Sequence, residues 1–345
     1  MELIDPFGRT VRDLRISITD RCNFRCTYCM PAEGMKWLPR EEVLTYEELH
    51  RVASICVSHF DVDGIRLTGG EPTMRAHFPV LINNLSALHV PATANSPRAG
   101  KPIDLAVTTN GATLRLIAQE LHDSGLRRIN ISLDTLKKQR FLEMTRRDEL
   151  EHVLDGIDAA IATGFSPVKI NVVVQRGVND SELLTLCEYF RARGHAVRFI
   201  EFMDVGNTNH WSVERVVPAK EIVERIGAKW PLAAVGPAYR GEVAARYRYL
   251  DGRGEIGIIS SVTEPFCRDC HRARLSADGK LFTCLFASLG WDVLGALRAG
   301  ADAAGLETYL SRVWGGRLDR YSDERAELIA TGEARAKIEM SYIGG

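Results

Sequence analysis

Hydrophobic and polar positions along the first 200 residues follow two alternating periods. Short apolar, β-branched runs predict strands, and amphipathic stretches between them predict helices. The predicted strands cover residues 14–19, 65–69, 104–109, 128–133, 169–175 and 197–202. The predicted helices cover residues 45–60, 78–88, 113–124, 149–163 and 181–193. Thr45 and Glu48 have the spacing of a capping box, and Gly125, Gly164 and Gly194 fit helix C-termini.

Six strand–helix repeats predict a parallel sheet with right-handed crossovers. Six units are too few for a closed eight-stranded barrel, so they favour an α/β fold with an open, partial barrel. A doubly wound sheet remains an alternative on pattern alone. The alternation stops near residue 215, so we expect one domain over 1–215 and a second, α+β domain over 216–345. Residues 91–102 predict a surface loop.

Composition and charge narrow the class of protein. The chain has 345 residues and a formal net charge of -1, which argues against a general nucleic-acid or membrane-surface binder. No apolar run approaches the length of a membrane span, so we expect a soluble, cytoplasmic protein. Six of the eight cysteines fall in two compact sets, which indicates metal binding in a reducing compartment. The other two, Cys56 and Cys187, lie in helical patterns and are expected to be ordinary buried residues.

The first cysteine set is Cys22, Cys26 and Cys29, with the spacing C-x3-C-x2-C. Three thiolates can hold a cubane iron–sulfur cluster and leave the fourth iron open to a substrate or cofactor. The alternatives are structural zinc and inert thiols. Zinc sites usually pair one C-x2-C with another, so this spacing disfavours zinc. Tyr28 could cover the cluster or stack on an adenine.

The second cysteine set is Cys267, Cys270 and Cys284, where zinc is a stronger competitor because C-x2-C is common in zinc sites. With the first set present, a second cluster is favoured. A β-hairpin that turns at residues 278–279 is predicted between Cys270 and Cys284. Strand alternation places Arg272 and Arg274 on one face, where an anion such as phosphate would relieve their repulsion. A two-residue loop would place Cys284 opposite Ala273, and a three-residue loop would reverse that parity.

Polar and glycine-rich segments end most of the predicted strands. They include Arg15 with the first cysteine set, residues 68–72 (TGGEP), residues 108–111 (TTNG), Ser132 and Met203. Because the carboxyl ends of parallel strands meet at one edge, these segments predict a single site. The chain ends in Gly344 and Gly345, which are either a frayed terminus or a tail slim enough to thread into a crowded pocket.

Together these motifs, with residues 7–9, 14–34 and the ISLD run at 131–134, resemble the GTP 3',8-cyclase family. Its members are radical S-adenosylmethionine enzymes of molybdenum cofactor biosynthesis. The resemblance covers nearly the whole chain. The first cysteine set alone would indicate only the superfamily. The second set with its two arginines, and the terminal glycines, are specific to the cyclase.

The resemblance implies a partial (β/α)6 TIM-like barrel with a C-terminal α+β extension that carries a second iron–sulfur cluster. Cys22, Cys26 and Cys29 would hold the [4Fe–4S] cluster that cleaves S-adenosylmethionine. The second set would hold another, whose open iron binds guanine. The positions that match cofactor contacts are Tyr28, Gly70, Ser132 and Met203. Those that match GTP contacts are Arg15, Arg66, Thr108, Lys169, Arg272, Ala273 and Arg274, of which Arg15, Arg272 and Arg274 are expected to be catalytic.

In the implied reaction a 5'-deoxyadenosyl radical removes the ribose 3'-hydrogen of GTP. The carbon radical attacks guanine C8, and reduction gives (8S)-3',8-cyclo-7,8-dihydroguanosine 5'-triphosphate. The implied partners are cyclic pyranopterin monophosphate synthase as the next enzyme and an electron donor such as flavodoxin or ferredoxin; a homodimer is allowed. One departure is Gly64, where many members carry lysine. The rival interpretations are a peptide-modifying radical enzyme with two clusters and a zinc-stabilised binding protein.

Overall fold

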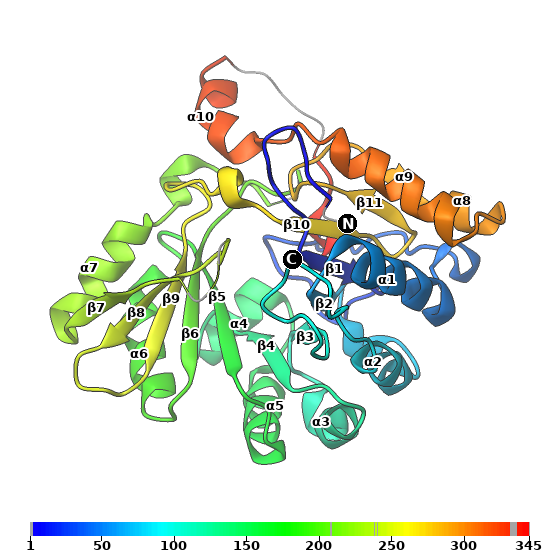
Figure 1. Ribbon diagram of the computed structural model, residues 1–345. Helices are drawn as coiled ribbons and strands as arrows, with labels where there is room; N and C mark the ends of the chain where they lie inside the picture. Colours follow the sequence, from blue (N-terminus) through cyan, green and yellow to red (C-terminus); the bar gives the residue numbers. More distant parts are fainter. Residues whose placement is uncertain (1–2, 208, 238, 240, 332–336, 345) are drawn as a thin grey trace.

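The computed structural model describes residues 3–207, 209–237, 239, 241–331 and 337–344, so the expectation for Gly345 lies outside the described residues. The described strands form one sheet in the order β12-β11-β10-β1-β2-β3-β4-β5-β6-β9-β8-β7. The sheet is curved, and helices cover its outer face (Figure 1). The two ends of this order come from the last third of the chain.

The centre of the sheet holds six parallel strands in chain order. They are β1 (Asp13–Ser17), β2 (Gly64–Thr68), β3 (Asp104–Thr109), β4 (Arg128–Ser132), β5 (Val168–Val174) and β6 (Ala196–Glu201). In a doubly wound sheet the strand order reverses at a switch point, whereas here it runs from 1 to 6 without reversal. The partial barrel predicted from the sequence is therefore confirmed, and all six predicted strands are present with ends moved by two residues or fewer.

The five predicted helices are also present. They are α1 (Tyr46–Phe60), α2 (Phe78–Ser86), α3 (Leu114–Asp123), α5 (Leu150–Thr163) and α6 (Leu183–Arg191). The capping box is formed, because Thr45 accepts from the Glu48 N–H while the Glu48 carboxylate accepts from the Thr45 N–H. Within the first 200 residues, the helix α4 (Lys138–Thr145) was not predicted. Short 3₁₀ helices lie at η1 (Arg40–Glu42), η2 (Pro72–Met74), η3 (Asp180–Glu182), η4 (Val213–Arg215) and η5 (Cys267–Asp269).

The strand–helix alternation ends after β6, yet the remaining chain extends the same sheet at both edges. After α7 (Ala219–Lys229), one edge gains β7 (Leu232–Val235), β8 (Ala245–Tyr249) and β9 (Glu255–Ile259). The other edge gains β10 (Arg272–Leu275), β11 (Lys280–Phe282) and β12 (Trp291–Asp292). The chain continues through α8 (Val293–Arg298), α9 (Ala303–Gly315), α10 (Tyr321–Thr331) and α11 (Met340–Ile343). In Figure 1, β10 lies beside β1, which brings the second cysteine set next to the first.

The β10–β11 hairpin settles the register that the sequence left open. Arg274 pairs with Phe282 and Leu275 with Leu281, so the pairing continues to Ser276 and Lys280 across a three-residue loop. This register places Cys284 level with Arg272 rather than with Ala273. The third cysteine of the second set therefore shares a face with the two arginines.

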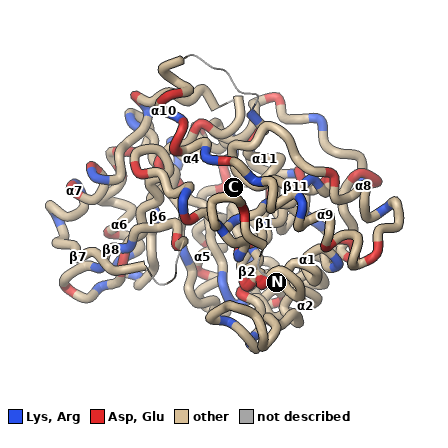
Figure 2. The backbone as a smooth tube through the Cα atoms, turned by 45° about the horizontal axis from the view of Figure 1, so that its top comes forward, with Lys and Arg blue, Asp and Glu red and all other residues tan. Residues whose placement is uncertain are grey.

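The interior packs apolar side chains from the strands against those from the surrounding helices. Cys56 and Cys187 are buried there, as predicted. Lysine and arginine alternate with aspartate and glutamate over the chain, and neither sign dominates one side (Figure 2). Within the described ranges, no helix is both long and apolar enough to cross a bilayer.

Candidate active site

A cavity of about 280 Å³ lies at the carboxyl ends of the central strands and touches all six cysteines of the two sets. Other residues that the sequence had singled out line it as well: Arg15, Tyr28, Arg66, Gly70, Thr108, Ser132, Met203, Arg272 and Arg274. The single site predicted from the strand ends is therefore formed. Three predicted residues that the structure describes do not line the cavity, namely Lys169, Ala273 and Gly344.

The first cysteine set lies on the loop that follows β1. The N–H groups of Cys29 and Met30 both donate to the Cys26 carbonyl at 3.0 Å, which folds the loop into a turn. The loop is fixed from outside by α4, because Arg25 N donates to Thr145 O and Thr27 N to Met144 O, each at 2.9 Å. The helix that sequence reasoning missed thus supports the loop on which the first set depends.

Burial governs the thiols of the first set. It raises the pKa of Cys29 to about 12, and together with Glu71 it raises that of Cys22 to about 11. Burial likewise raises the pKa of Cys26. Without a bound cation these thiols are neutral at pH 7, so a bound metal group must displace their protons.

Two buried carboxylates face the first set, and sequence reasoning assigned neither of them a role. Asp134 accepts a hydrogen bond from Tyr28 Oη at 2.7 Å and one from Val173 N at 2.8 Å, and burial raises its pKa to about 6. Glu71 accepts from Thr109 Oγ1 and from Asn110 N, each at 2.6 Å. Both belong to strand-end motifs, TGGEP and ISLD, which was the available signal.

Gly70 lies where the β2 loop passes closest to the cysteine loop. A Cβ atom at this position would stand 2.3 Å from the Arg21 carbonyl oxygen. Any other residue would push the two loops apart, so the glycine is needed for this close approach. Gly69 and Gly70 both line the cavity, which agrees with the site predicted at the strand ends.

The second cysteine set differs from the first because cations lie beside one of its thiols. Arg272 Nη2 donates to Cys270 Sγ at 3.2 Å. Burial alone would raise the pKa of Cys270, but Arg272 and Arg317 outweigh it and lower the pKa to about 5. Cys284 is different, because burial and Asp319 raise its pKa to about 12. This set therefore presents one thiolate at neutral pH even before a metal binds.

Four arginines form a row on three adjacent strands. In the sheet register Arg15 of β1 is level with Arg66 of β2 and with Arg274 of β10, and Arg272 follows two residues earlier on β10. Arg15 and Arg274 are close enough that burial and mutual repulsion lower the pKa of Arg15. The buried Nε atoms of Arg15 and Arg66 have no hydrogen-bond partner among the described residues. Such a row calls for an anion with several oxygen atoms.

The C-terminal segment reaches this row. Arg274 Nη1 donates to the Gly344 carbonyl at 2.5 Å. Gly344 has a φ of 71°, and a Cβ atom there would stand 2.4 Å from Thr68 Cγ2. Glycine is therefore required at position 344, and the alternative of a frayed end does not hold for Gly344.

Lys169 lies on β5, just outside the cavity lining. Burial and the neighbouring Arg198 lower its pKa to about 8. Arg198 itself lines the cavity from β6 and was missed by sequence reasoning, although its inward position in the strand alternation was a usable signal. Tyr239 and Glu242, from the connection between β7 and β8, also line the cavity and carried no motif.

The donor set fits two iron–sulfur groups. Each set offers three cysteines on one cavity wall and no fourth cysteine, which leaves a coordination position free. Within the described part of the chain, no three His, Cys, Asp or Glu side chains form a group that could hold a metal ion as they stand.

Comparisons with known proteins agree with this site. The sequence model of the radical SAM superfamily matches residues 16–190, and that described as Molybdenum Cofactor Synthesis C matches residues 195–323. Fold and site thus define a radical S-adenosylmethionine enzyme. A GTP 3',8-cyclase of Acidothermus cellulolyticus is 48% identical and covers 99% of this chain and 98% of the relative. One from Staphylococcus carnosus is 43% identical and covers 100% and 99%. The chain belongs to the GTP 3',8-cyclase family.

Solved structures support the fold. Streptococcus suis SuiB bound to S-adenosylmethionine superimposes with a TM-score of 0.56. The match covers 88% of this chain and 69% of SuiB, at 13% sequence identity. At that identity the likeness shows a shared fold and carries no information about the substrate.

Proposed function

We propose that this enzyme converts GTP into (8S)-3',8-cyclo-7,8-dihydroguanosine 5'-triphosphate, the first step of molybdenum cofactor biosynthesis. The observation that carries the proposal is the row formed by Arg15, Arg66, Arg272 and Arg274, which lines the cavity together with the two cysteine sets. Guanidinium groups match phosphate oxygens in geometry and charge, and a triphosphate offers enough of them to satisfy all four side chains. The relatives named GTP 3',8-cyclase support the choice of nucleotide.

The first cysteine set is proposed to hold a [4Fe–4S] cluster with S-adenosylmethionine on its open iron. When bound, this group would supply the electron that releases a 5'-deoxyadenosyl radical to take the ribose 3'-hydrogen. The C3' radical then adds to guanine C8, and a second electron with a proton reduces the radical that remains. Tyr28, Gly70, Ser132 and Met203 line the cavity and are proposed to hold the cofactor. The Tyr28 hydroxyl fixes the Asp134 carboxylate, a suitable acceptor for a ribose hydroxyl or an ammonium group.

The second cysteine set is proposed to hold another [4Fe–4S] cluster, with the guanine on its open iron. Arg272, Arg274 and Arg15 would then clamp the triphosphate and position C3' and C8 for bond formation. Arg66 and Thr108, which line the cavity, are proposed as further GTP contacts. Lys169 and Ala273 are proposed to contribute from behind the lining.

A cavity whose walls carry both cysteine sets suits radical chemistry, because those walls limit side reactions of the intermediate. The enzyme needs a one-electron donor, for which we propose a flavodoxin or ferredoxin in a reducing cytoplasm. Cyclic pyranopterin monophosphate synthase is proposed to take the product, and the homodimer stays a prediction. Residues 1–215 are proposed to carry the first cluster and generate the radical, and residues 216–345 to carry the second cluster, with GTP contacts contributed by both parts.

The test is anaerobic turnover with S-adenosylmethionine, dithionite and GTP that carries deuterium at the ribose 3' position. We expect 5'-deoxyadenosine that has gained one deuterium, together with the cyclised nucleotide. If no 5'-deoxyadenosine forms, the proposal fails. A peptide-modifying activity would instead give 5'-deoxyadenosine without deuterium from GTP.

A matched pair of variants tests the arginine row. Arg272→Ala should abolish cyclisation while iron content stays near that of the unaltered enzyme. Arg248→Ala removes a similar charge from an exposed position on β8 and should leave both unchanged. Loss of iron in Arg272→Ala would show that the arginine has a structural role.

A further inference from the structure

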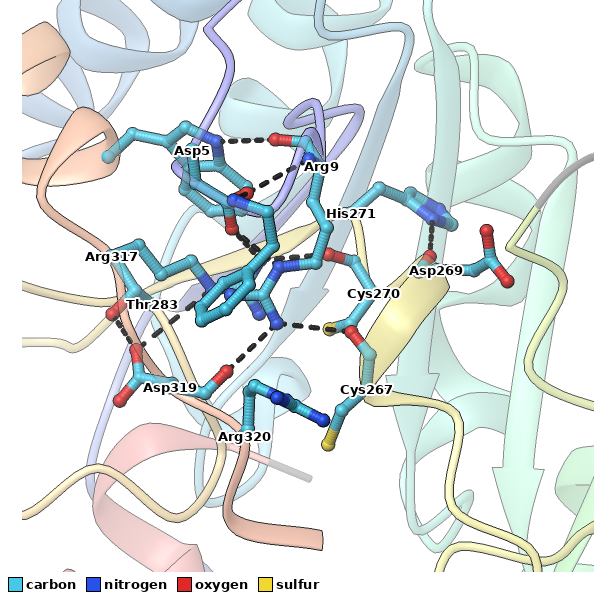
Figure 3. A network of polar contacts seen from close by, with 12 residues as sticks. Asp5, Arg9, Cys267, Asp269, Cys270, His271, Thr283, Arg317, Asp319 and Arg320 are labelled. Atoms are coloured by element: carbon cyan, nitrogen blue, oxygen red, sulfur yellow. Dashed lines mark hydrogen bonds and ion pairs between the residues drawn. The ribbon is translucent and has the colours of Figure 1, made fainter. Parts of the chain in front are cut away.

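Two buried arginines behind the second cysteine set have no part in the proposed GTP site. Arg9 comes from the N-terminal segment and Arg317 from the turn after α9, and they are 4% and 3% exposed. Arg317 Nη1 donates to the Cys270 carbonyl at 2.8 Å, and Arg9 Nη1 donates to the Cys267 carbonyl at 3.1 Å (Figure 3). Charged donors therefore fix the backbone of two of the three cysteines.

Two carboxylates hold these arginines in place. Asp5 is 4% exposed; it accepts from Arg9 Nε at 2.5 Å and lies 3.7 Å from Arg317 Nη1. Asp319 lies 3.9 Å from Arg317 Nε, and its carboxylate accepts from the Thr283 hydroxyl, one residue before Cys284. Figure 3 shows the four side chains gathered on one side of Cys267 and Cys270. The network thus reaches the backbone at or beside each of the three cysteines.

The charges of this network lie beside different cysteines. Arg317 donates to the Cys270 carbonyl, whereas the Asp319 carboxylate accepts from Thr283, next to Cys284. Arg317 and Asp319 also line the cavity, while Asp5 and Arg9 do not. The buried Nε of Arg317 has no hydrogen-bond partner among the described residues. One cation and one anion of the network therefore face whatever the three cysteines hold.

We propose that Arg317 is a positioning residue that sets the reduction potential of the iron–sulfur group held by Cys267, Cys270 and Cys284, with Asp319 acting in the opposite direction. This inference rests on the proposed function, which places a cluster there. Reduction adds negative charge to the group, so a buried guanidinium beside it favours the reduced form and raises the potential. A carboxylate at the same place favours the oxidised form and lowers it. Asp5 and Arg9 keep Arg317 from turning away.

The experiment uses the full-length chain with Cys22, Cys26 and Cys29 replaced by alanine, so that any iron–sulfur signal comes from the second set. Iron and sulfide are determined first, and the midpoint potential is then measured by titration monitored with electron paramagnetic resonance. Arg317→Gln should lower the midpoint potential, and Arg317→Lys, which keeps the charge, should restore most of the shift. Arg312→Gln removes the same charge from an exposed position on α9 and should leave the potential unchanged.

Asp319→Asn gives the opposite sign and should raise the midpoint potential. A purely structural role would not move the potential in opposite directions for the two variants. The inference is overturned if Arg317→Gln holds full iron at an unchanged potential. If both Arg317 variants lose iron, the inference is tested by the Asp319→Asn variant instead. An unchanged midpoint potential in that variant overturns the inference. If the chain that carries alanine at Cys22, Cys26 and Cys29 contains no iron, the second cluster itself is refuted. If the unaltered enzyme fails to turn over with both sets loaded, only the proposed reaction is refuted.

Discussion

The two cysteine sets line one cavity with the same number of thiols, yet their surroundings differ in charge. The first set lies on one short loop, is buried beside Glu71 and Asp134, and has pKa values raised at all three thiols. The second set spans a hairpin and lies between Arg272 and Arg317, which lower the pKa of Cys270 to about 5. Equal donor sets can therefore be prepared for different tasks by the charges behind them.

The difference fits the proposed division of labour. The first set receives a cofactor with a positive sulfonium centre, so buried carboxylates nearby are favourable and arginines are not needed. The second set stands beside the site proposed for a triphosphate, so the cations that stabilise its thiolate also attract the substrate. Both sets open to one cavity, which allows the radical made at one to react at the other.

The largest expected effect is a difference in the product that each cysteine set is needed to form. Cys26→Ser should reduce 5'-deoxyadenosine formation to background, because the first set then loses a ligand. Cys270→Ser should still cleave S-adenosylmethionine but give no cyclised nucleotide. Anaerobic turnover with both products measured by mass spectrometry checks this, and 5'-deoxyadenosine formation lost equally in both variants would erase the distinction.

The electrostatic contrast should be visible in the protein stripped of metal. Cys270, with a pKa of about 5, should react with iodoacetamide roughly 100-fold faster at pH 7 than Cys29, whose pKa is about 12. The Cys270 rate should be flat from about pH 6 to 9, while the Cys29 rate should rise throughout. Peptide mapping gives both rates in one sample. Equal rates would contradict the contrast, and Arg272→Gln should move the pH at which the Cys270 rate levels off to a higher value while leaving the Cys29 profile unchanged.

A smaller effect tests the arginine row on the side of the second set. Arg274→Ala removes one charged hydrogen-bond donor, a loss of about 1.5–3 kcal/mol, so GTP should bind roughly 10- to 100-fold more weakly. Equilibrium binding of GTP measures this change, with Arg248→Ala as the exposed control. The affinity for S-adenosylmethionine should not change in either variant. A parallel loss of cofactor affinity would mean that the two halves of the cavity are not independent.

The smallest effect concerns the side of the first set. Tyr28→Phe deletes the hydroxyl that donates to Asp134 at 2.7 Å. Losing one hydrogen bond costs about 1 kcal/mol, so the KM for S-adenosylmethionine should rise roughly fivefold, with GTP affinity unchanged. The same hydrogen bond lowers the pKa of Asp134, so its removal should also move that pKa above about 6. An unchanged KM would place the cofactor away from Tyr28.

The sequence alone determined much of this protein. Strand and helix periods, the capping box at Thr45 and the glycine-rich strand ends depend on local chemistry, so the pattern predicted the barrel. The spacings of the two cysteine sets and the arginine pair could also be recognised in the sequence. Helix α4 escaped prediction because its apolar face is short, although it fixes the first cysteine loop.

Other features were decided only by tertiary structure. The pairing of β10 with β1 brings Arg274 level with Arg15, although they are far apart in sequence, and a three-residue loop places Cys284 level with Arg272. The Asp5–Arg9–Arg317–Asp319 network likewise joins the two ends of the chain. Local pattern cannot encode such pairings, because the energy that fixes them comes from burying distant charges and strands together, and only the folded chain shows which groups meet.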